Sequence, residues 1–589
     1  MEQRPQATED HHDLTAITSL SPVSTAGGHE HSTPETASPQ PATATKRRLQ
    51  LSSNRLLSLD LLRGLAILLM ITCNAQVGDS VFPILSHPEW IGFTIADTIF
   101  PSFLFITGCT VPLSIRADPN PKPGSHYYRN QALRVFKRSV IIWFLGVVLN
   151  LYGLVQLHVG GDQFRWPNVL NRIGFCYLVV GWMHLLVLWR GRQPEKPLST
   201  SYLFSADARQ PRSQPTEFAT DSKIPLEDDQ HQQTPQEQDD SGPWPWFVRV
   251  TLPYYLPAAC LIIWLICTYT VQVEGCPERA MIYDPACSPQ AYFDLKIFGT
   301  NHTYRHLNFD PEGSLSTLTS ILNVWFGWFI GCTVRSLNAQ VKQVSNDFKT
   351  QRENRGSQES LIEMVLEQEM VLRLYSEHLG QWFWLGLLWM FTGWIFSFGL
   401  PLSKPSWTAT FAVLSVGVSQ TMLSILFYKF DVQPKVKQLK QLHLDHQGFR
   451  SSNQLDRHYR HRGADLERSG AATLTRTNYS SLLHVYFQVD HFLRHWFRKG
   501  IIVVLGSMGR NAILLYMCSE LVQGTCWLVP GGPPGPDGEA LDLFTTVYNH
   551  TWGALDIGGW GSLFYGMGFA ALHVLLAIFL DHKKWYFKV

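Results

Sequence analysis

The sequence predicts an all-α, polytopic integral membrane protein with about ten transmembrane helices and both termini in the cytosol. Three observations predict this class. Apolar runs of roughly 20 residues, the length that crosses a bilayer core, recur along the 589 residues. Lys and Arg gather beside these runs on one side, as the positive-inside rule requires. No segment is strongly basic and the net charge is +1, so the composition indicates a lipid bilayer and not nucleic acid as a partner.

Ten apolar runs are candidate spans. Helix is expected in each, because lipid offers no hydrogen-bond partner to an open sheet edge. With ten spans, the basic flanks fall on the cytosolic side, whereas the opposite loops 78–93 and 523–559 contain no Lys or Arg. The runs cover residues 61–77, 94–115, 139–155, 169–189, 252–271, 315–334, 379–400, 407–427, 501–522 and 560–580.

Polar segments separate these spans and define the predicted order of domains. Residues 1–54, rich in Ser, Thr, Pro, Gln and His, are expected to form a disordered cytosolic tail, and 55–190 the first half of the membrane domain. We expect a disordered cytosolic linker at 191–243, spans with a lumenal loop at 244–335 and a cytosolic loop at 336–378. We then expect a membrane hairpin at 379–428 and a polar cytosolic insertion at 429–498. The last predicted segment, 499–589, holds two spans and a basic C-terminus.

Two kinds of marker fall on the predicted lumenal side. Glycosylation sequons begin at Asn301 and Asn549, and a third, at Asn478, falls on the cytosolic side and is expected to be unmodified. Cys276 and Cys287 share one polar loop. A disulfide there requires an oxidising compartment, and the ten residues between them permit the bond without requiring it. None of the ten cysteines forms a CxxC pair with zinc spacing, so no metal is expected.

The stretch 74–101 is the predicted centre of the chemistry. His87 carries an imidazole, the usual general base near neutral pH, although an interfacial histidine beside Trp90 is an alternative. Asp97 enters the second span, where an ionisable side chain indicates function or caps the helix start. Asn74 closes the first span.

Arg55 and Arg63 flank Asp60 at the cytosolic mouth of the first span. Guanidinium groups suit phosphate, but an ordinary basic flank with an Asp60–Arg63 pair explains the same residues. Asn74 follows Arg63 by eleven residues, about 16 Å along a helix. A ligand with phosphates at this mouth and a long thin arm, the shape of an acyl-CoA, could therefore reach Asn74 and His87.

Two further polar residues lie within apolar runs. Arg172 in the fourth span needs an anionic partner, which Asp310 or Glu312 could supply, and a structural ion pair between helices is the alternative. Asn511 in the ninth span could hold helices together. We assign both Arg172 and Asn511 to binding of the acyl-donating co-substrate.

Seven stretches carry a resemblance to a known family. They are R..SLD.LRG from Arg55, HPEWIGFTIADTIFPSFLFITG from His87, RWPNVLNRIG from Arg165, GCP at Gly275, FDPEGSLSTLTSI from Phe309, GRNAILLY from Gly509 and HKKWYFKV at the C-terminus. Their order and content resemble the lysosomal heparan-α-glucosaminide N-acetyltransferase family and its bacterial relatives. The resemblance covers the membrane part, from about residue 55 to the end, apart from the polar insertions.

The resemblance implies acetyl-CoA as cytosolic co-substrate and a terminal glucosamine amine as lumenal acceptor. The family's active histidine falls on His87, the asparagine of its first span on Asn74 and its arginine motif on Arg55 and Arg63. Either His87 deprotonates the acceptor for direct attack, or it becomes acetylated and passes the group on. A lysosome or vacuole, another endomembrane or the plasma membrane is the expected location, and a homodimer is a further expectation.

The chain also departs from the family pattern. It has a polar tail where the animal enzyme has a lumenal domain and an extra span, and Ser519 stands before Glu520 where that enzyme has a histidine. An N- or O-acetyltransferase for another small molecule therefore stays open. So does a transporter without chemistry, in which polar residues such as Asn171, Arg172, Asn323 and Asn511 line a path.

Overall fold

The computed structural model describes residues 56–78, 81–118, 126–157, 161–190, 243–277, 282–354, 361–441, 498–534, 540–555 and 557–587. Several predictions about polar segments concern other parts of the chain. Arg55, the tail 1–54, nearly all of the linker 191–243, residues 442–497 of the polar insertion and the sequon at Asn478 lie outside the described residues.

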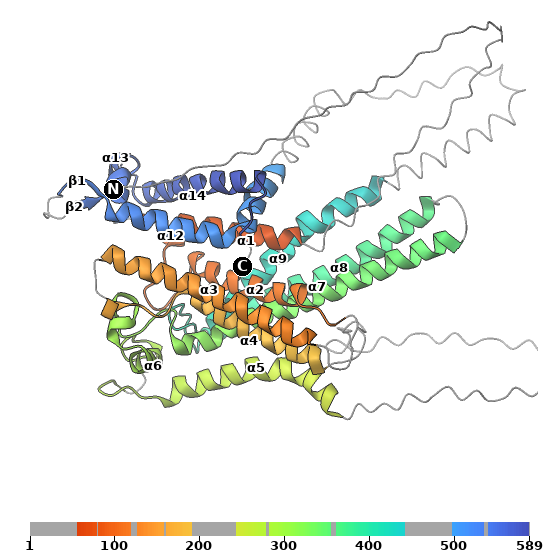
Figure 1. Cartoon of the computed structure of the whole chain (residues 1–589), viewed down its shortest axis with the longest axis horizontal. Coiled ribbons are helices and arrows are strands. Elements are labelled where there is room, and N and C mark those ends of the chain that lie inside the picture. Colours follow the sequence, from red (N-terminus) through yellow and green to blue (C-terminus); the bar gives the residue numbers. More distant parts are fainter. Residues whose placement is uncertain are drawn as a thin grey trace, which may run out of the picture. The chain divides into compact units, whose positions relative to one another are not determined.

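The described residues are almost entirely helical, which confirms the all-α class (Figure 1). A short antiparallel pair, β1 (Pro530–Pro534) and β2 (Ala540–Asp542), is the exception among them. The helices are α1 (Leu57–Asn74), α2 (Ile99–Ser114), α3 (Tyr127–Leu157), α4 (Val169–Arg190), α5 (Pro243–Thr270), α6 (Pro289–Ile297), α7 (Ser314–Asn354), α8 (Leu361–Phe396), α9 (Ala409–Phe427), Arg498–Arg510, α12 (Ala512–Leu528), α13 (Leu543–His550) and α14 (Gly559–His582).

Eight helices in the described ranges are long and apolar enough to cross a membrane, and a ninth results if Arg498–Arg510 and α12 form one bent span. The chain is therefore an integral membrane protein, with fewer clear spans than the ten predicted. The predicted span 379–400 falls in the second half of α8, which is not among the eight. Four tryptophans and Gln381 make that run less apolar than the others. The sidedness of the spans stays a prediction.

Helices α2 and α7 form the centre of the membrane part. In an apolar 18-residue stretch of each candidate span, 72% of the residues are buried in α2 and 67% in α7 and in α9, against 22% in α3 and 28% in α5. Glycines allow the central pair to approach closely: a Cβ on Gly108 would overlap the carbonyl oxygen of Val324, and one on Gly327 the carbonyl oxygen of Phe105. Small residues of this kind are how membrane helices bring their backbones together.

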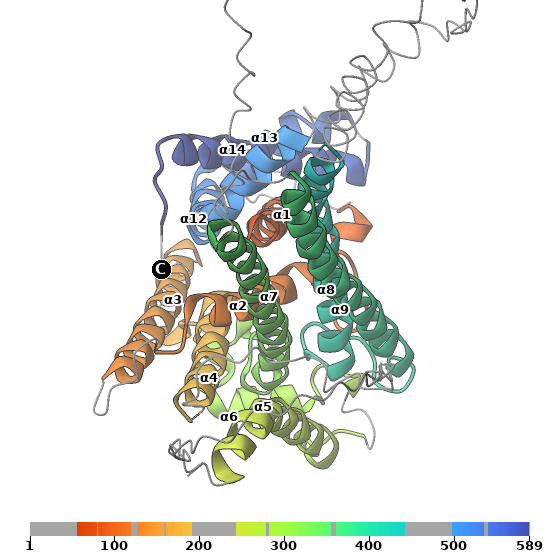
Figure 2. The same ribbon diagram turned by 90° about the vertical axis from the view of Figure 1, so that its right-hand side faces the viewer.

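The other helices surround this pair (Figure 2). Helix α3 packs along α4, α8 along α9, and α5 against both α7 and α4. Their outer faces carry large exposed apolar side chains, among them Phe144 of α3, Trp384 of α8 and Leu572 of α14. In water such surfaces would be costly, so these faces are the ones that lipid covers.

Helices α7 and α8 extend well beyond the predicted spans, and helical turns continue past the end of α9 to Gln441. The sequence predicts a cytosolic loop over 336–378, but α7 runs to Asn354 and α8 begins at Leu361. The extensions share a buried apolar cluster, in which Leu337 and Val341 meet Val371, Tyr375 and Val432. This core explains why the segment is helical although it is too polar to span a membrane.

The predicted single span 501–522 is two helices. Arg498–Arg510 and α12 meet at an angle of 79°, and Asn511 between them has non-helical backbone angles. The C-terminal tail occupies this break: Asn511 Nδ2 donates to the carbonyl of Trp585 at 3.2 Å, and Asn511 Oδ1 accepts from Phe587 N–H at 3.1 Å. Hydrogen bonds to the tail thus replace the helical ones that an unbroken span would form.

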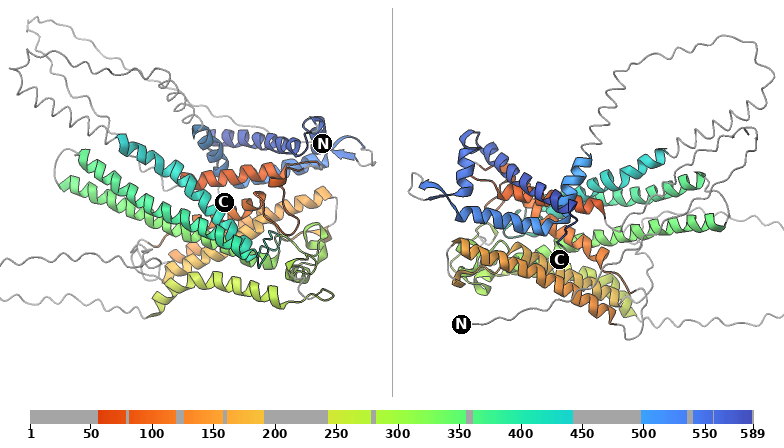
Figure 3. Two further views of the ribbon diagram at one scale, coloured as in Figure 1. Left: turned by 180° about the vertical axis from the view of Figure 1, so that it is seen from behind. Right: turned by 45° about the horizontal axis from the view of Figure 1, so that its top comes forward.

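Several loops gather at one end of the helices, the left end in Figure 1, which is also visible from behind and in a tilted view in Figure 3. Trp90 Nε1–H, in the loop after α1, donates to the carbonyl of Ile282 at 2.8 Å. Tyr548 of α13 lies against Gly78. These contacts join the loops that the sequence places on the lumenal side.

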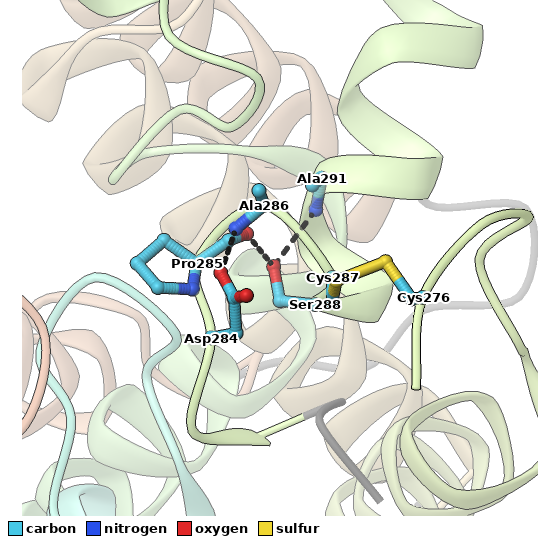
Figure 4. The surroundings of a disulfide bond; sticks show 7 residues. All are labelled: Cys276, Asp284, Pro285, Ala286, Cys287, Ser288 and Ala291. Atoms are coloured by element: carbon cyan, nitrogen blue, oxygen red, sulfur yellow. Dashed lines mark hydrogen bonds between the residues drawn. A yellow bond between two sulfur atoms is a disulfide. The ribbon is translucent and has the colours of Figure 1, made fainter. Parts of the chain in front are cut away.

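A disulfide joins Cys276 and Cys287 in this group of loops (Figure 4). The turn beside it leads into α6: the Ser288 hydroxyl caps the helix by accepting from Ala291 N–H at 3.2 Å, and it donates to the carbonyl of Pro285. The bond that the sequence left open is formed.

Candidate active site

The loop between α1 and α2 is held in a fixed path by its own hydrogen bonds. Gly92, at φ +143°, adopts a backbone conformation that favours glycine, and its N–H donates to the carbonyl of Leu402 at 2.8 Å. The Thr94 hydroxyl donates to the carbonyl of Ser86 at 2.8 Å. The loop then enters a 3-10 turn, Ala96–Thr98, directly before α2. This path brings His87 back over the start of α2.

His87 and Asp97 form a close pair at that point. Their Nδ1 and Oδ1 atoms lie 2.7 Å apart, with the Asp97 side chain fully buried and that of His87 44% exposed. The second carboxylate oxygen of Asp97 accepts from the Thr94 N–H at 3.0 Å and from its hydroxyl at 3.3 Å. Because an ionised carboxylate accepts only, a neutral His87 carries its proton on Nδ1, and the Nε2 lone pair is the reactive one.

Lys404 completes this cluster from the loop between α8 and α9. Its Nζ lies 3.2 Å from Nδ1 and 3.0 Å from Nε2 of His87, and 3.8 Å from Asp97 Oδ1. Burial lowers the pKa of the Lys404 ammonium, while Asp97 and Glu312 act in the opposite direction. The site therefore holds a carboxylate, an imidazole and an amine within hydrogen-bonding or ion-pair distance of one another.

Asn74 lies at the end of α1 beside this cluster. Its Nδ2 donates to Glu520 Oε1 of α12 at 3.1 Å, and its carbonyl accepts from Gln523 Nε2 at 2.8 Å. Cys73, the residue before it, is close enough to Lys404 and Asp97 for an electrostatic interaction. Asn74 thus connects the His87 cluster with a carboxylate from the C-terminal part of the chain.

A second charged cluster lies next to the first. Arg165 holds Asp310 in a two-pronged ion pair, at 2.8 Å from Nε and 2.7 Å from Nη2, and Nη2 also contacts Glu312 at 2.5 Å. Burial raises the pKa of Glu312, but the cations Arg165, Arg172 and Lys404 outweigh it and hold the pKa below its ordinary value. Glu312 thus stays ionised within reach of Lys404.

The expected ion pair of Arg172 is corrected by this geometry. Asp310 and Glu312 bind Arg165, whereas Arg172 donates to the carbonyl of Pro311 at 2.8 Å and to Ser316 Oγ at 2.5 Å. Its guanidinium also lies 4.9 Å from the ring centre of Trp407. Arg172 is almost fully buried and braces the start of α7, while its contact with the co-substrate stays a prediction.

The other predicted binding residues lie apart from His87. Arg63 lies six positions after the first residue of α1. It pairs with Asp60 at 3.1 Å and donates to the carbonyl of Gly509 at 3.4 Å. Both amide atoms of Asn511 bind the C-terminal tail. Since α1 is unbroken between Arg63 and Asn74, those two lie about 16 Å apart along its axis.

The structure thus pairs His87 with Asp97 and adds Lys404. Glu312 and Cys73, the neighbour of Asn74, lie within electrostatic range of Lys404, and Asn74 itself binds Glu520. One feature of the sequence could have marked Lys404 as a candidate site residue. It is a basic residue in a short loop on the predicted lumenal side, where the positive-inside rule makes Lys uncommon. Within the described residues, no group of three or more His, Cys, Asp or Glu side chains is arranged to hold a metal ion.

Known proteins match this part of the chain. A family model described as heparan-alpha-glucosaminide N-acetyltransferase, catalytic, matches residues 55–190. The mouse heparan-alpha-glucosaminide N-acetyltransferase is 27% identical over 340 residues, which are 54% of this chain and 45% of the relative. The human protein of the same name is 27% identical over 327 residues, 52% of this chain and 42% of the relative.

The matched region spans less than half of the length of either relative. The shorter match of the family model contains three of the candidate site residues, because Asn74, His87 and Asp97 all lie within 55–190. The resemblance inferred from the sequence motifs is confirmed: this chain is similar to the heparan-alpha-glucosaminide N-acetyltransferase family, and its pair of His87 and Asp97 lies in the segment that the family's catalytic model matches.

Proposed function

We propose that this protein is a membrane acetyltransferase that moves the acetyl group of cytosolic acetyl-CoA to an acceptor on the opposite side, most simply the amine of a terminal glucosamine. The pair of His87 and a buried Asp97 at 2.7 Å carries this proposal. A histidine oriented by a carboxylate is the arrangement that acyl transfer uses to activate a nucleophile. The names of the relatives supply the acetyl group and the class of acceptor.

In this proposal Asp97 fixes the tautomer of His87 and leaves Nε2 for chemistry. On the direct route, the acceptor nitrogen attacks the thioester carbon, Nε2 takes a proton from that nitrogen, and CoA leaves as its thiolate. On the two-step route, Nε2 itself attacks, CoA leaves, and the acceptor amine then displaces imidazole from the acetyl carbon. Exchange of labelled CoA into acetyl-CoA without acceptor occurs on the second route alone and distinguishes the two.

We propose that acetyl-CoA lies along α1, with its phosphates near Arg63 and Arg55 and its thioester near Asn74. The continuous helix between these positions supports this placement. Asn511 is the weaker candidate for a co-substrate contact, because the C-terminal tail already binds both its amide atoms. Arg172 donates through Nη2 alone, and its buried Nε and Nη1 have no hydrogen-bond partner among the described residues.

Two of the polar residues named for the transporter alternative are hydrogen-bonded within the protein. Asn323 is buried and donates to Ser415 Oγ at 3.1 Å, while its oxygen accepts from Trp407 Nε1–H at 3.0 Å. Asn171 donates to the carbonyl of Trp166. The bond from Asn323 joins α7 to α9, and the bond from Asn171 holds α4 to the loop before it. These contacts give both residues a structural role that needs no transport path.

For the compartment, we propose a lysosome, a vacuole or another endomembrane, with the plasma membrane as the alternative. The disulfide between Cys276 and Cys287 supports an oxidising environment on the side of the gathered loops.

The test is CoA release from acetyl-CoA by purified protein in detergent, with and without glucosamine. Because general-base or nucleophilic catalysis contributes at least about 100-fold, His87→Ala should lose glucosamine-dependent release by that factor while still binding acetyl-CoA. His126→Ala, a change at an exposed histidine before α3, is the matched control and should keep wild-type turnover. Equal turnover of the two variants would refute the role of His87, and wild type without any turnover would redirect the search to other acceptors.

A further inference from the structure

The buried carboxylate of Asp97 has two basic side chains beside it. His87 Nδ1 lies 2.7 Å and Lys404 Nζ 3.8 Å from the same oxygen, Oδ1. A fully buried carboxylate is costly unless a cation compensates its charge. Either His87 becomes an imidazolium or Lys404 supplies the charge as an ammonium. The first choice would remove the lone pair that acyl transfer requires.

The position of Lys404 fits the second choice. Its Nζ is nearly equidistant from both ring nitrogens of His87, at 3.2 Å and 3.0 Å. A hydrogen bond directed along the Nε2 lone pair, in the plane of the ring, would leave Nδ1 much farther away. The ammonium therefore acts on the imidazole through its charge from beside the ring, and the lone pair is not consumed by an in-plane bond.

Other charged or titratable groups act on the cluster from neighbouring elements. They are Cys73 of α1, Arg172 of α4 and Glu312 before α7, each close enough to Lys404 for an electrostatic interaction. Glu312 favours the charged lysine and Arg172 opposes it, so these two partly cancel. Asp97 is the group closest to both His87 and Lys404.

We propose that Lys404 is a positioning residue that neutralises Asp97 and thereby keeps His87 in its neutral, reactive form. The inference deepens the proposed function, since it states how an imidazole in contact with a carboxylate stays available as base or nucleophile. Without the ammonium, Asp97 would favour the imidazolium. Lys404 touches neither the acetyl group nor the acceptor in this scheme and acts through His87.

Diethyl pyrocarbonate tests this without any acetyl transfer, because it acylates neutral imidazole and not imidazolium. The rate of modification of His87 is followed by peptide mass spectrometry as a function of pH, with the exposed His126 and His550 of the same molecules as internal references. Removal of a charge a few ångströms away shifts such a titration by about one pH unit. In Lys404→Met the midpoint for His87 should therefore rise by about one pH unit.

Two further variants sharpen the test. Lys404→Arg keeps the positive charge and should keep the wild-type midpoint, while Asp97→Asn removes the anion and should lower it. The references at His126 and His550 should not move in any variant. Lys404→Gln serves as a second neutral variant if Lys404→Met fails to fold. A midpoint for His87 that is unchanged or lower in the neutral variants overturns the proposal.

A pH profile of CoA release then connects the inference with catalysis. In the neutral variants the acidic limb should move to higher pH and activity should return towards wild type at alkaline pH, which a merely structural loss would not do. If wild type shows no CoA release with glucosamine but the modification midpoint shifts as expected, glucosamine fails as the proposed acceptor and the role of Lys404 stands. If wild type releases CoA but the midpoint does not shift, the proposed function stands and the role of Lys404 is refuted.

Discussion

Which of the two arginines near the start of α4 forms an ion pair could not be assigned from their positions in the sequence. Arg165 and Arg172 lie seven residues apart, yet Arg165 takes both carboxylates of Asp310 and Glu312. The start of α7 and an aromatic ring surround Arg172 instead. Arg165 precedes α4 in a loop and can reach the fully buried Asp310, whereas Arg172 is fixed inside α4. Position relative to the helix start thus decided which arginine became the ion-pair partner.

This pairing leads to a prediction at the residue scale. Arg165→Ala leaves the carboxylate of Asp310 buried without its guanidinium, and an uncompensated buried charge costs about 3–5 kcal/mol. We expect a clear drop in the thermal unfolding temperature of the detergent-solubilised protein. Arg165→Lys should recover part of the loss, because it restores the charge without the two-pronged geometry.

The control is Arg305→Ala, which removes an exposed arginine from the segment before α7. It should leave the unfolding temperature close to that of wild type. If both alanine variants melt alike, the Arg165–Asp310 pair contributes no stability of its own.

At the scale of elements, the approach of α2 to α7 depends on glycine. The same device recurs where α1 meets Arg498–Arg510: a Cβ on Gly64 would overlap the carbonyl of Leu505, and one on Gly509 the carbonyl of Asp60. Asp97 lies directly before α2, and Asn74 lies at the end of α1. The positions of both candidate site residues therefore depend on helices whose distance from their neighbours is set by glycine.

An alanine substitution where α7 crosses α2 tests whether glycine is required for their close approach. Alanine usually stabilises a helix by up to about 1 kcal/mol relative to glycine, but Gly327→Ala must push a carbonyl of α2 away. We expect destabilisation by about 1–3 kcal/mol, typical of overpacking, measured as a lower unfolding temperature. Gly568→Ala in α14, where no atom lies within 4 Å of the added Cβ, should be neutral or stabilising. A stabilised Gly327→Ala variant would contradict the close approach.

At the scale of the whole molecule, the gathered loops define one side of the membrane part. The loop after α1, the disulfide segment and α13 contact one another through Trp90, Ile282, Gly78 and Tyr548. Both described sequon asparagines belong to this group, Asn301 in a short turn after α6 and Asn549 in the last turn of α13, and both are exposed. Their position agrees with the side that the distribution of Lys and Arg predicts as lumenal.

Glycosylation therefore tests the topology. Peptide-N-glycosidase should increase the electrophoretic mobility of protein expressed in eukaryotic cells, and Asn301→Gln and Asn549→Gln should each remove part of that shift. Asn478→Gln should change nothing, since Asn478 falls on the predicted cytosolic side. Glycan found solely at Asn478 would invert the orientation of every span.

Much of this protein follows from its sequence alone. Apolar runs of bilayer length determined the helical membrane class, because lipid forbids unpaired backbone. Residue type and place made His87, Asp97 and Asn74 candidates one by one: an imidazole in the loop after the first span, an ionisable side chain entering the second span, and a polar amide near the end of the first. These are local properties, and a single stretch of chain contains them.

The tertiary structure alone decided the rest. Lys404 lies 317 positions from His87, and no local pattern connects them. The bend at Asn511 arises from a tail that begins more than 70 residues later, and the extensions of α7 and α8 exist because they bury a shared core. Contacts between distant segments depend on how whole helices pack, and helix packing is set by small residues and buried charges from many parts of the chain at once.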